Sequence, residues 1–170
     1  MRRTAFGFSL CVFLAAYRPA GSDTLVSFSH PEQFTDAAPH GRHGLAAMLP
    51  TLTQIDQYLK GLGARGLRSQ QTLVVEVMNI DLAGQFEPWR ALATDVRVMR
   101  DIYPPRITLR FKLIDNSRTS LEGEDELVDL NYLANPDTRL IGDPLRYEKA
   151  MLSGWFRNRL LSAKSVYSGS

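Results

Sequence analysis

The chain has a single cysteine and, after its apolar start, no long hydrophobic run. That cysteine, Cys11, lies within the apolar start, so the rest of the chain can form no disulfide and offers no thiolate as nucleophile or metal ligand. The sequence also lacks a G-x-S-x-G elbow, an H-E-x-x-H zinc motif and a glycine-rich phosphate loop. No residue pattern therefore dictates a reaction, and we expect no cofactor.

The apolar start has the pattern of a secretory signal peptide. A basic Met1–Arg3 precedes an apolar run over residues 5–16, which is too short to span a bilayer as a helix. Small residues then offer a cleavage site before Asp23, with cleavage after Ala16 as the alternative. We predict a signal peptide over residues 1–22 and a periplasmic or secreted protein whose mature chain has no transmembrane segment.

The charge of the mature chain argues against a nucleic-acid partner. The formal net charge is +2, but the signal peptide contributes Arg2, Arg3 and Arg18 and no acid, which leaves the mature chain with one net negative charge. A nucleic-acid-binding domain needs a surplus of basic residues. We therefore expect an envelope protein or a small ligand as the partner, and no nucleic acid.

Residues 23–170 are predicted to form one α+β domain. Alternating or β-branched apolar segments predict strands, and apolar residues at steps of three and four predict helices. The strands are expected over residues 26–28, 72–80, 96–99, 106–114 and 119–130, and the helices over 45–62 and from Asp143 onward. A His-, Gly- and Pro-rich loop over 30–44 and a frayed tail over 162–170 complete the domain. These elements predict a two-layer α+β sandwich, with a small, mostly antiparallel sheet and two main helices on one face.

Both helices carry an apolar stripe that predicts core packing. The stripe of the first helix consists of Leu45, Met48, Leu49, Leu52, Ile55, Leu59 and Leu62. Glycines at positions 61, 63 and 66 are interpreted as its stop signals. The last helix is expected to begin with Asp143 as N-cap and Pro144 at its first position, and to bury Leu145, Met151, Leu152, Trp155 and Phe156.

Charges are expected to face each other across a hairpin. One face of strand 106–114 carries Arg106, Arg110 and Lys112, and the next strand carries Glu122, Glu124 and Glu126. Opposite charges on adjacent strands support the register. We interpret this face as solvated, with a docking surface as the alternative.

The long connection after residue 80 holds four carboxylates, Asp81, Glu87, Asp95 and Asp101, together with Trp89 and Arg90. Paired carboxylates can serve as general acid and base when their surroundings separate their pKa values. The competing interpretation is a structural corner in which Trp89 caps the core and Arg90 pairs with an acid.

The histidines supply a candidate metal site. His30, His40 and His43 fall in one loop, but no helix fixes their spacing. Metal handling is therefore kept as an alternative function, with no metal ligand assigned.

Glu148 falls inside the apolar stripe of the last helix, as does Arg159. A carboxylate that faces a core needs a partner. We predict that Glu148 pairs with a cation, the candidates being Arg100, Arg97 and Arg106 in that order.

Several blocks of the sequence form a recognisable set: Asp81–Gly84 with Phe86–Arg90, Asp95–Asp101, Asp129–Tyr132, Asp143–Lys149 and Trp155–Phe156. Together they resemble a family of exported bacterial proteins, the domain-of-unknown-function family numbered 3016. The resemblance spans roughly residues 25–161 and departs at Ile102–Pro105 and in the His-rich loop. The family has no established activity, so the resemblance implies no catalytic or binding role.

The sequence favours an exported binding or interaction module over an enzyme, because recognition commonly sits on loops held by a rigid scaffold. A small periplasmic hydrolase using carboxylates of the 81–101 region is the first alternative, and weak metal handling is the second. The candidate functional surface consists of Asp81, Glu87, Trp89, Arg90, Arg97, Arg100, Asp101, Tyr147 and Glu148.

Overall fold

The computed structural model describes residues 22–38, 44–87, 96–138 and 142–162. Several predictions fall outside these segments: the signal peptide up to Gly21, the tail after Ser162, and His40, His43, Trp89, Arg90 and Asp95.

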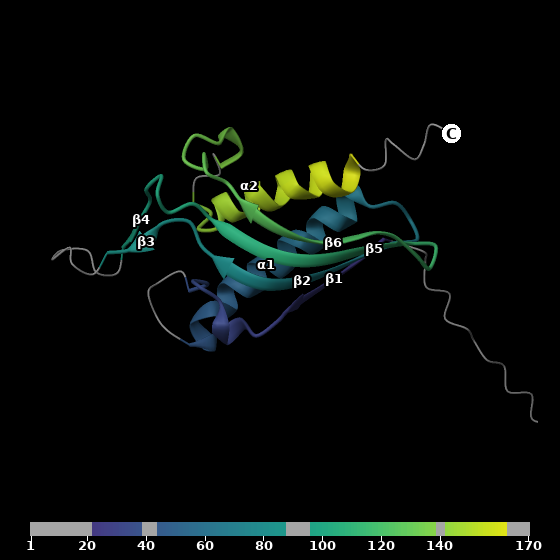
Figure 1. Ribbon diagram of the computed structural model, residues 1–170, viewed down its shortest axis with the longest axis horizontal. Coiled ribbons are helices and arrows are strands. Elements are labelled where there is room, and N and C mark those ends of the chain that lie inside the picture. The colour runs from purple at the N-terminus through teal and green to yellow at the C-terminus, as the bar shows by residue number, and fades with distance from the viewer. Residues whose placement is uncertain (1–21, 39–43, 88–95, 139–141, 163–170) are drawn as a thin grey trace, which may run out of the picture.

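The described residues form a two-layer α+β structure. A four-stranded sheet carries both main helices, α1 (Leu45–Gly66) and α2 (Arg146–Trp155), on one face (Figure 1). The predicted fold class is therefore confirmed. Within the described segments, no helix is long and apolar enough to cross a bilayer.

The sheet has the order β1-β2-β5-β6. Its strands are β1 (Asp23–Phe28), β2 (Gln71–Asp81), β5 (Arg106–Asp115) and β6 (Arg118–Val128). β1 runs parallel to β2, and α1 connects the two strands, whereas β2, β5 and β6 are antiparallel. β1 and β6 are thus the edges of the sheet.

Shorter elements lie in the connections. They are η1 (Pro31–Gln33), β3 (Gln85–Phe86), β4 (Arg97–Val98), η2 (Pro136–Thr138) and the π-helix η3 (Phe156–Leu161) that continues α2. β3 pairs with β4 in a second, two-stranded sheet. The short strand predicted over residues 96–99 is confirmed at β4, but β3 was missed because two residues are too few to show a period.

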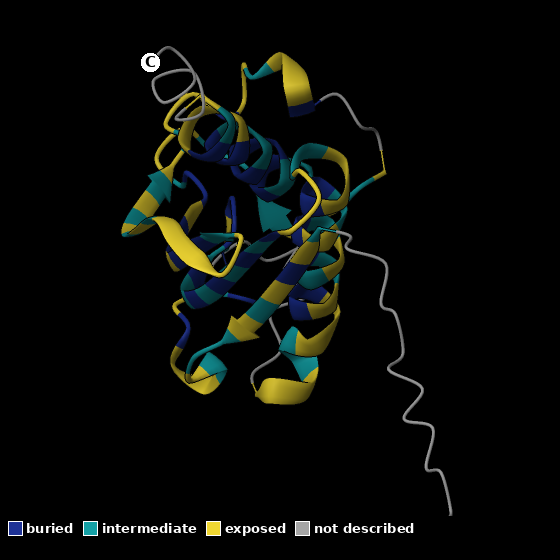
Figure 2. Ribbon diagram, turned by 90° about the vertical axis from the view of Figure 1, so that its right-hand side faces the viewer, coloured by how far each residue is buried: buried dark blue, intermediate teal, exposed yellow. Residues whose placement is uncertain are grey.

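The core lies between the inner sheet face and the two helices. Buried and exposed residues alternate along β5, as its sequence predicts, and form bands on the strands in Figure 2. Five predicted core residues of the last helix region are buried, namely Leu145, Met151, Leu152, Trp155 and Phe156. The stripe of α1 is buried only from Leu52 onward, since Leu45 and Leu49 are 48% and 52% exposed. That part of the prediction is wrong because helical periodicity does not reveal where the sheet beneath a helix ends.

The ends of both helices differ from the predictions. α1 continues through Gly61 and Gly63 to Gly66, so the first two glycines do not stop it. A Cβ at Gly63 would collide with the hydroxyl of Thr24 on β1, and Gly63 therefore allows the helix to approach the sheet. α2 begins at Arg146, and Asp143 accepts the N–H of Leu145 at 2.9 Å in the turn before it.

Gly63→Ala is expected to lower the free energy of unfolding by about 1–3 kcal/mol, because the added methyl group overpacks the contact between α1 and β1. Urea denaturation measures the loss. Gly154→Ala is the matched control, since a Cβ at this helical glycine would meet nothing within 4 Å. It should raise stability by up to about 1 kcal/mol through helix propensity. An equal increase in the free energy of unfolding from both substitutions would contradict a close approach of α1 to β1 at Gly63.

The outer face of the sheet carries the predicted ladder of charges. Arg110 on β5 lies 3.0 Å from Glu76 on β2 and 3.1 Å from Glu124 on β6. Lys112 pairs with Glu122 at 3.0 Å, and Arg106 lies 3.7 Å from Glu126. The prediction is confirmed, and the row through Arg110 alternates acid, base and acid across three strands.

Candidate functional site

Arg97 on β4 is the centre of a buried polar network near the end of β2. Its guanidinium donates to the carbonyl oxygen of Gly84 at 2.7 Å and to the Asp36 carboxylate at 2.8 Å. It also reaches three further backbone carbonyl oxygens. Only 10% of the Arg97 side chain is exposed. Arg97 thereby ties segment 36–38, which follows β1, to the loop 82–84, which follows β2.

Glu148 attaches α2 to the same loop. It is buried, with 1% exposed, as predicted. One carboxylate oxygen accepts the backbone N–H of Ala83 at 2.8 Å, and the other has no hydrogen-bond partner. Burial raises the pKa of Glu148, against the opposing effects of the Ala83 N–H and the charge of Arg97.

The predicted cation partner of Glu148 is wrong for the described residues. The three candidate arginines pair elsewhere: Arg100 with Glu87, Arg97 with Asp36, and Arg106 with Glu126. A carboxyl whose pKa is raised can be buried in its neutral form, and a backbone N–H satisfies one of its oxygens. Glu148 therefore needs no cation in direct contact.

Tyr132 and Tyr147 form a small second core beside the network, together with Ala83 and Met99. Their rings meet edge to face, with centroids 4.8 Å apart. The Tyr132 hydroxyl donates to the carbonyl oxygen of Arg100 at 2.7 Å. The segment that follows β6 is thus anchored to the network as well.

The carboxylates considered for acid–base chemistry lie in different surroundings. Asp81 is partly buried, and burial raises its pKa, with a further increase from the neighbouring Asp36 and opposing effects from the charges of Arg106 and Arg97. Glu87 is buried and lies 3.0 Å from Arg100, whereas Asp101 is exposed. These three carboxylates therefore differ in their burial and in their charged neighbours.

The residues of the predicted functional surface therefore separate into two groups. Arg97, Arg100, Tyr147 and Glu148 lie in or beside the network. So do Glu87, which pairs with Arg100, and Asp81, which lies beside Asp36. Asp101 is exposed outside the network. The contacts of Arg97 and Glu148 hold the loop 82–84 and α2 in place.

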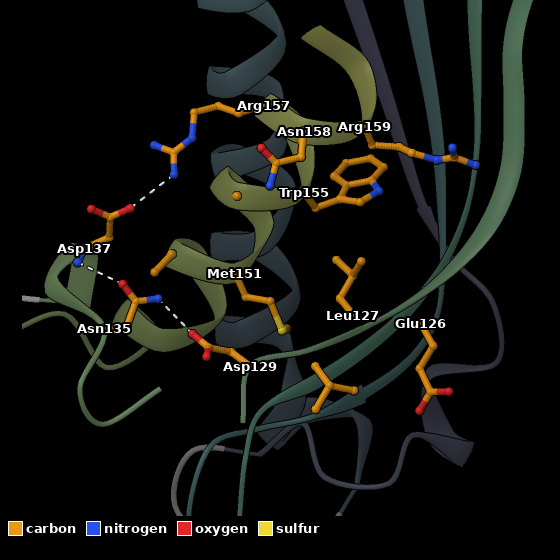
Figure 3. A pocket seen from close by; sticks show the side chains of 13 residues that line it. Glu126, Leu127, Asp129, Asn135, Asp137, Met151, Trp155, Arg157, Asn158 and Arg159 are labelled. Atoms are coloured by element: carbon orange, nitrogen blue, oxygen red, sulfur yellow. Dashed lines mark hydrogen bonds and ion pairs between the residues drawn. The ribbon is translucent and has the colours of Figure 1, made fainter. Parts of the chain in front are cut away.

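A groove lies between the edge strand β6 and the helices α2 and η3 (Figure 3). Its volume is about 500 Å³, within the range of pockets that hold small ligands or several side chains. Leu127, Met151 and Trp155 supply apolar side chains to its lining. The indole N–H of Trp155 donates to Asp125 at 2.9 Å, which fixes the ring against β6.

One wall of the groove is a chain of polar contacts in the segment after β6. Asn135 donates to Asp129 at 2.8 Å and accepts the backbone N–H of Asp137. Asp137 then pairs with Arg157 of η3 at 3.2 Å (Figure 3). Asp129 receives hydrogen bonds but forms no ion pair with the described residues, so no described cation neutralises its charge at this end of the groove.

The groove was missed by the sequence analysis. Gly154 lines it, and a glycine inside a helix costs about 1 kcal/mol relative to alanine. Since nothing would contact a Cβ there, packing does not explain this glycine. Gly154 was the sequence feature that could have pointed to the groove. The π-helix is a feature found often at functional sites, but its sequence does not distinguish it from an α-helix.

The candidate metal site is only partly described. His30 is exposed, and its Nδ1 lies 3.4 Å from Glu32, while His40 and His43 lie outside the described residues. Among the residues that the structure describes, no three His, Cys, Asp or Glu side chains are placed to hold a metal ion.

Comparison with known proteins identifies a family. A family model described as "Protein of unknown function (DUF3016)" matches residues 22–158, which span the Arg97 network and nearly all of the groove. No curated protein matches the chain. A crystal structure of a Xanthomonas campestris protein of the DUF330 family model is 14% identical, with 91% of this chain and 92% of that chain covered and a TM-score of 0.35. A likeness this weak supports no argument.

Proposed function

Because the chain belongs to the DUF3016 family, whose function is unknown, we propose a function from its own structure: it is an exported binding module that holds a partner in the groove between β6 and α2. The observation that carries the proposal is the groove itself. It combines apolar side chains, polar walls and the open edge of a strand, which are the features of recognition sites.

The Arg97 network supports this role by holding both sides of the groove. Glu148 attaches the first turn of α2 to the loop 82–84, and the same helix carries Met151 and Trp155. Tyr132 attaches the segment after β6 to Arg100. A preformed groove loses less conformational entropy when it binds than a mobile one does.

The hydrolase alternative has weaker support. Asp81 has a raised pKa, which is a feature of functional sites. However, the described groove is not lined by Asp81, Glu87 or Asp101. The binding function is therefore the better-supported proposal.

Peptides selected from a random display library on the purified protein are expected to lose binding by about tenfold or more when Gly154 is replaced by tryptophan. The indole would occupy the groove, and the open space around this position allows it to enter without disturbing the core. Fluorescence anisotropy with labelled peptides measures the affinity.

Gln57→Trp is the matched control, because it adds the same side chain at an exposed position of α1. It should leave the affinity unchanged. Selected peptides that bind Gly154→Trp as tightly as the unsubstituted protein would exclude the groove as the binding site.

The export part of the proposal rests on the first 22 residues and on the start of β1 at Asp23, directly after the proposed cleavage point. Mass spectrometry of protein recovered from a periplasmic extract is expected to find Asp23 as the first residue. Soluble cytosolic protein that keeps residues 1–22 would contradict export.

A further inference from the structure

We propose that the groove takes an extended polypeptide in which basic and apolar side chains alternate, and that this segment adds to the sheet as a strand beside β6. The inference rests on the proposed function and names the chemistry of the partner. Three features of the described residues carry it: the open edge of β6, the charges on the outer face of the sheet, and the apolar lining of the groove.

The edge of β6 offers backbone partners to an added strand. β6 pairs only with β5 among the described strands, so the N–H and C=O groups on its other side lack a strand partner. The groove runs beside this edge at Glu126–Val128. An extended peptide placed there can form main-chain hydrogen bonds with β6, as in other complexes formed by strand addition.

The outer face determines the charge of the added strand. Glu76, Arg110 and Glu124 alternate in sign across β2, β5 and β6, with each neighbouring pair at 3.0–3.1 Å. Among the described residues, Glu122, Glu124 and Glu126 form ion pairs only with bases of β5, and half or more of each side chain is exposed. A strand beside β6 continues the alternation when its outward side chains are Lys or Arg.

The inner face of the sheet determines the apolar half of the alternating pattern. Successive side chains of a strand point to opposite faces, so every second residue of the added strand points toward α2. There it meets Leu127, Met151 and Trp155, beside the open space at Gly154. Aliphatic side chains are removed from water at these positions. Asp129, which pairs with no described cation, attracts a further basic residue at one end.

The same charges disfavour a second copy of this chain as the occupant. Antiparallel pairing of β6 with β6 of another molecule brings the row Glu122, Glu124 and Glu126 beside an identical acidic row. Like charges on adjacent strands are destabilising. We therefore expect the unliganded protein to be monomeric at this edge.

The test uses short, capped synthetic peptides in which arginine and valine alternate. Isothermal titration should detect binding to the protein, and peptides with glutamate in place of arginine should bind about tenfold more weakly or worse. Methylation of the backbone nitrogens on one edge of the peptide removes the donors that strand addition needs, and should abolish binding.

The substitutions Glu124→Gln and Glu126→Gln, made together, should weaken binding of the basic peptide by about tenfold without introducing like charges beside Arg110. Glu32→Gln with Asp56→Asn removes the same charge on η1 and α1 and should leave binding unchanged. Equal affinity for acidic and basic peptides, or for methylated and unmethylated ones, would overturn the inference.

Two results distinguish this inference from the proposed function. If library peptides of another pattern bind and lose affinity in Gly154→Trp, the groove is the binding site and only the alternating basic strand is wrong. If Gly154→Trp changes the binding of no peptide, the proposed function fails as well. A dimer in analytical ultracentrifugation that dissociates in Gly154→Trp would place a second copy on β6 and also overturn the inference.

Discussion

Arg97→Met is expected to lower the free energy of unfolding by about 3–5 kcal/mol, the usual cost of removing one member of a buried ion pair. The substitution leaves the Asp36 carboxylate without its cation and leaves several backbone carbonyl groups without a donor. It also removes the guanidinium from the face of Phe86, where it lies 4.7 Å from the ring centroid. Urea denaturation followed by circular dichroism measures the loss. Such a change is a large share of the total stability of a domain, about 5–15 kcal/mol.

Arg110→Met is the control. Arg110 contacts two carboxylates, Glu76 and Glu124, but 55% of its side chain is exposed. Exposed pairs contribute about 0–1 kcal/mol each because water and salt screen them, so the expected loss is small. Similar losses from both substitutions would show that the Arg97 network is solvated rather than structural.

Glu148→Ala is expected to lower the free energy of unfolding by about 2–4 kcal/mol. The substitution leaves the buried N–H of Ala83 without an acceptor and opens a cavity beside α2. Glu122→Ala on the outer sheet face is the control. Glu122 is 61% exposed and contacts only Lys112, so its loss should stay below about 1 kcal/mol. Thermal unfolding at fixed pH compares the two, and small, equal shifts would place Glu148 in solvent.

The raised pKa of Glu148 also predicts the direction of a pH effect. The folded protein holds this proton more tightly than the unfolded chain, so stability falls as the pH rises from the ordinary carboxyl pKa through the raised one. Glu148→Gln cannot titrate and keeps an acceptor for Ala83. The stability of the unsubstituted protein relative to Glu148→Gln should therefore decrease as the pH rises. A relative stability that increases with pH would mean that the folded state favours the ionised carboxylate.

Several residues of the predicted functional surface are buried in the structure. Arg97, Glu148 and Tyr147 were predicted to belong to a functional surface, and the structure places each of them largely in the interior. Their contacts hold α2 and the segment after β6 at fixed positions. Under the proposed function, these residues act indirectly, by maintaining the shape of the groove.

Local patterns were sufficient to predict the regular elements. The strict alternation from Arg106 to Ile114 predicted both the buried face of β5 and the charge ladder on its other face, because side chains of a strand alternate between the two faces. The apolar spacing of α2 likewise predicted its buried residues. The burial of Glu148 followed from its place in that stripe.

The sequence by itself therefore determined the fold class, the inner and outer faces of the main strands, and the burial of one carboxyl group on α2, since these depend on the period of a single segment. Only the tertiary structure decided which groups meet across long separations. It assigned Glu148 to a backbone N–H at Ala83, Arg97 to Asp36, and Gly63 to a contact with Thr24. It also produced the groove, because β6 and α2 form its two sides only after the sheet and the helices have packed. A periodic pattern indicates which way a side chain points. The partner of that side chain depends on the distances between elements, which only the whole fold determines.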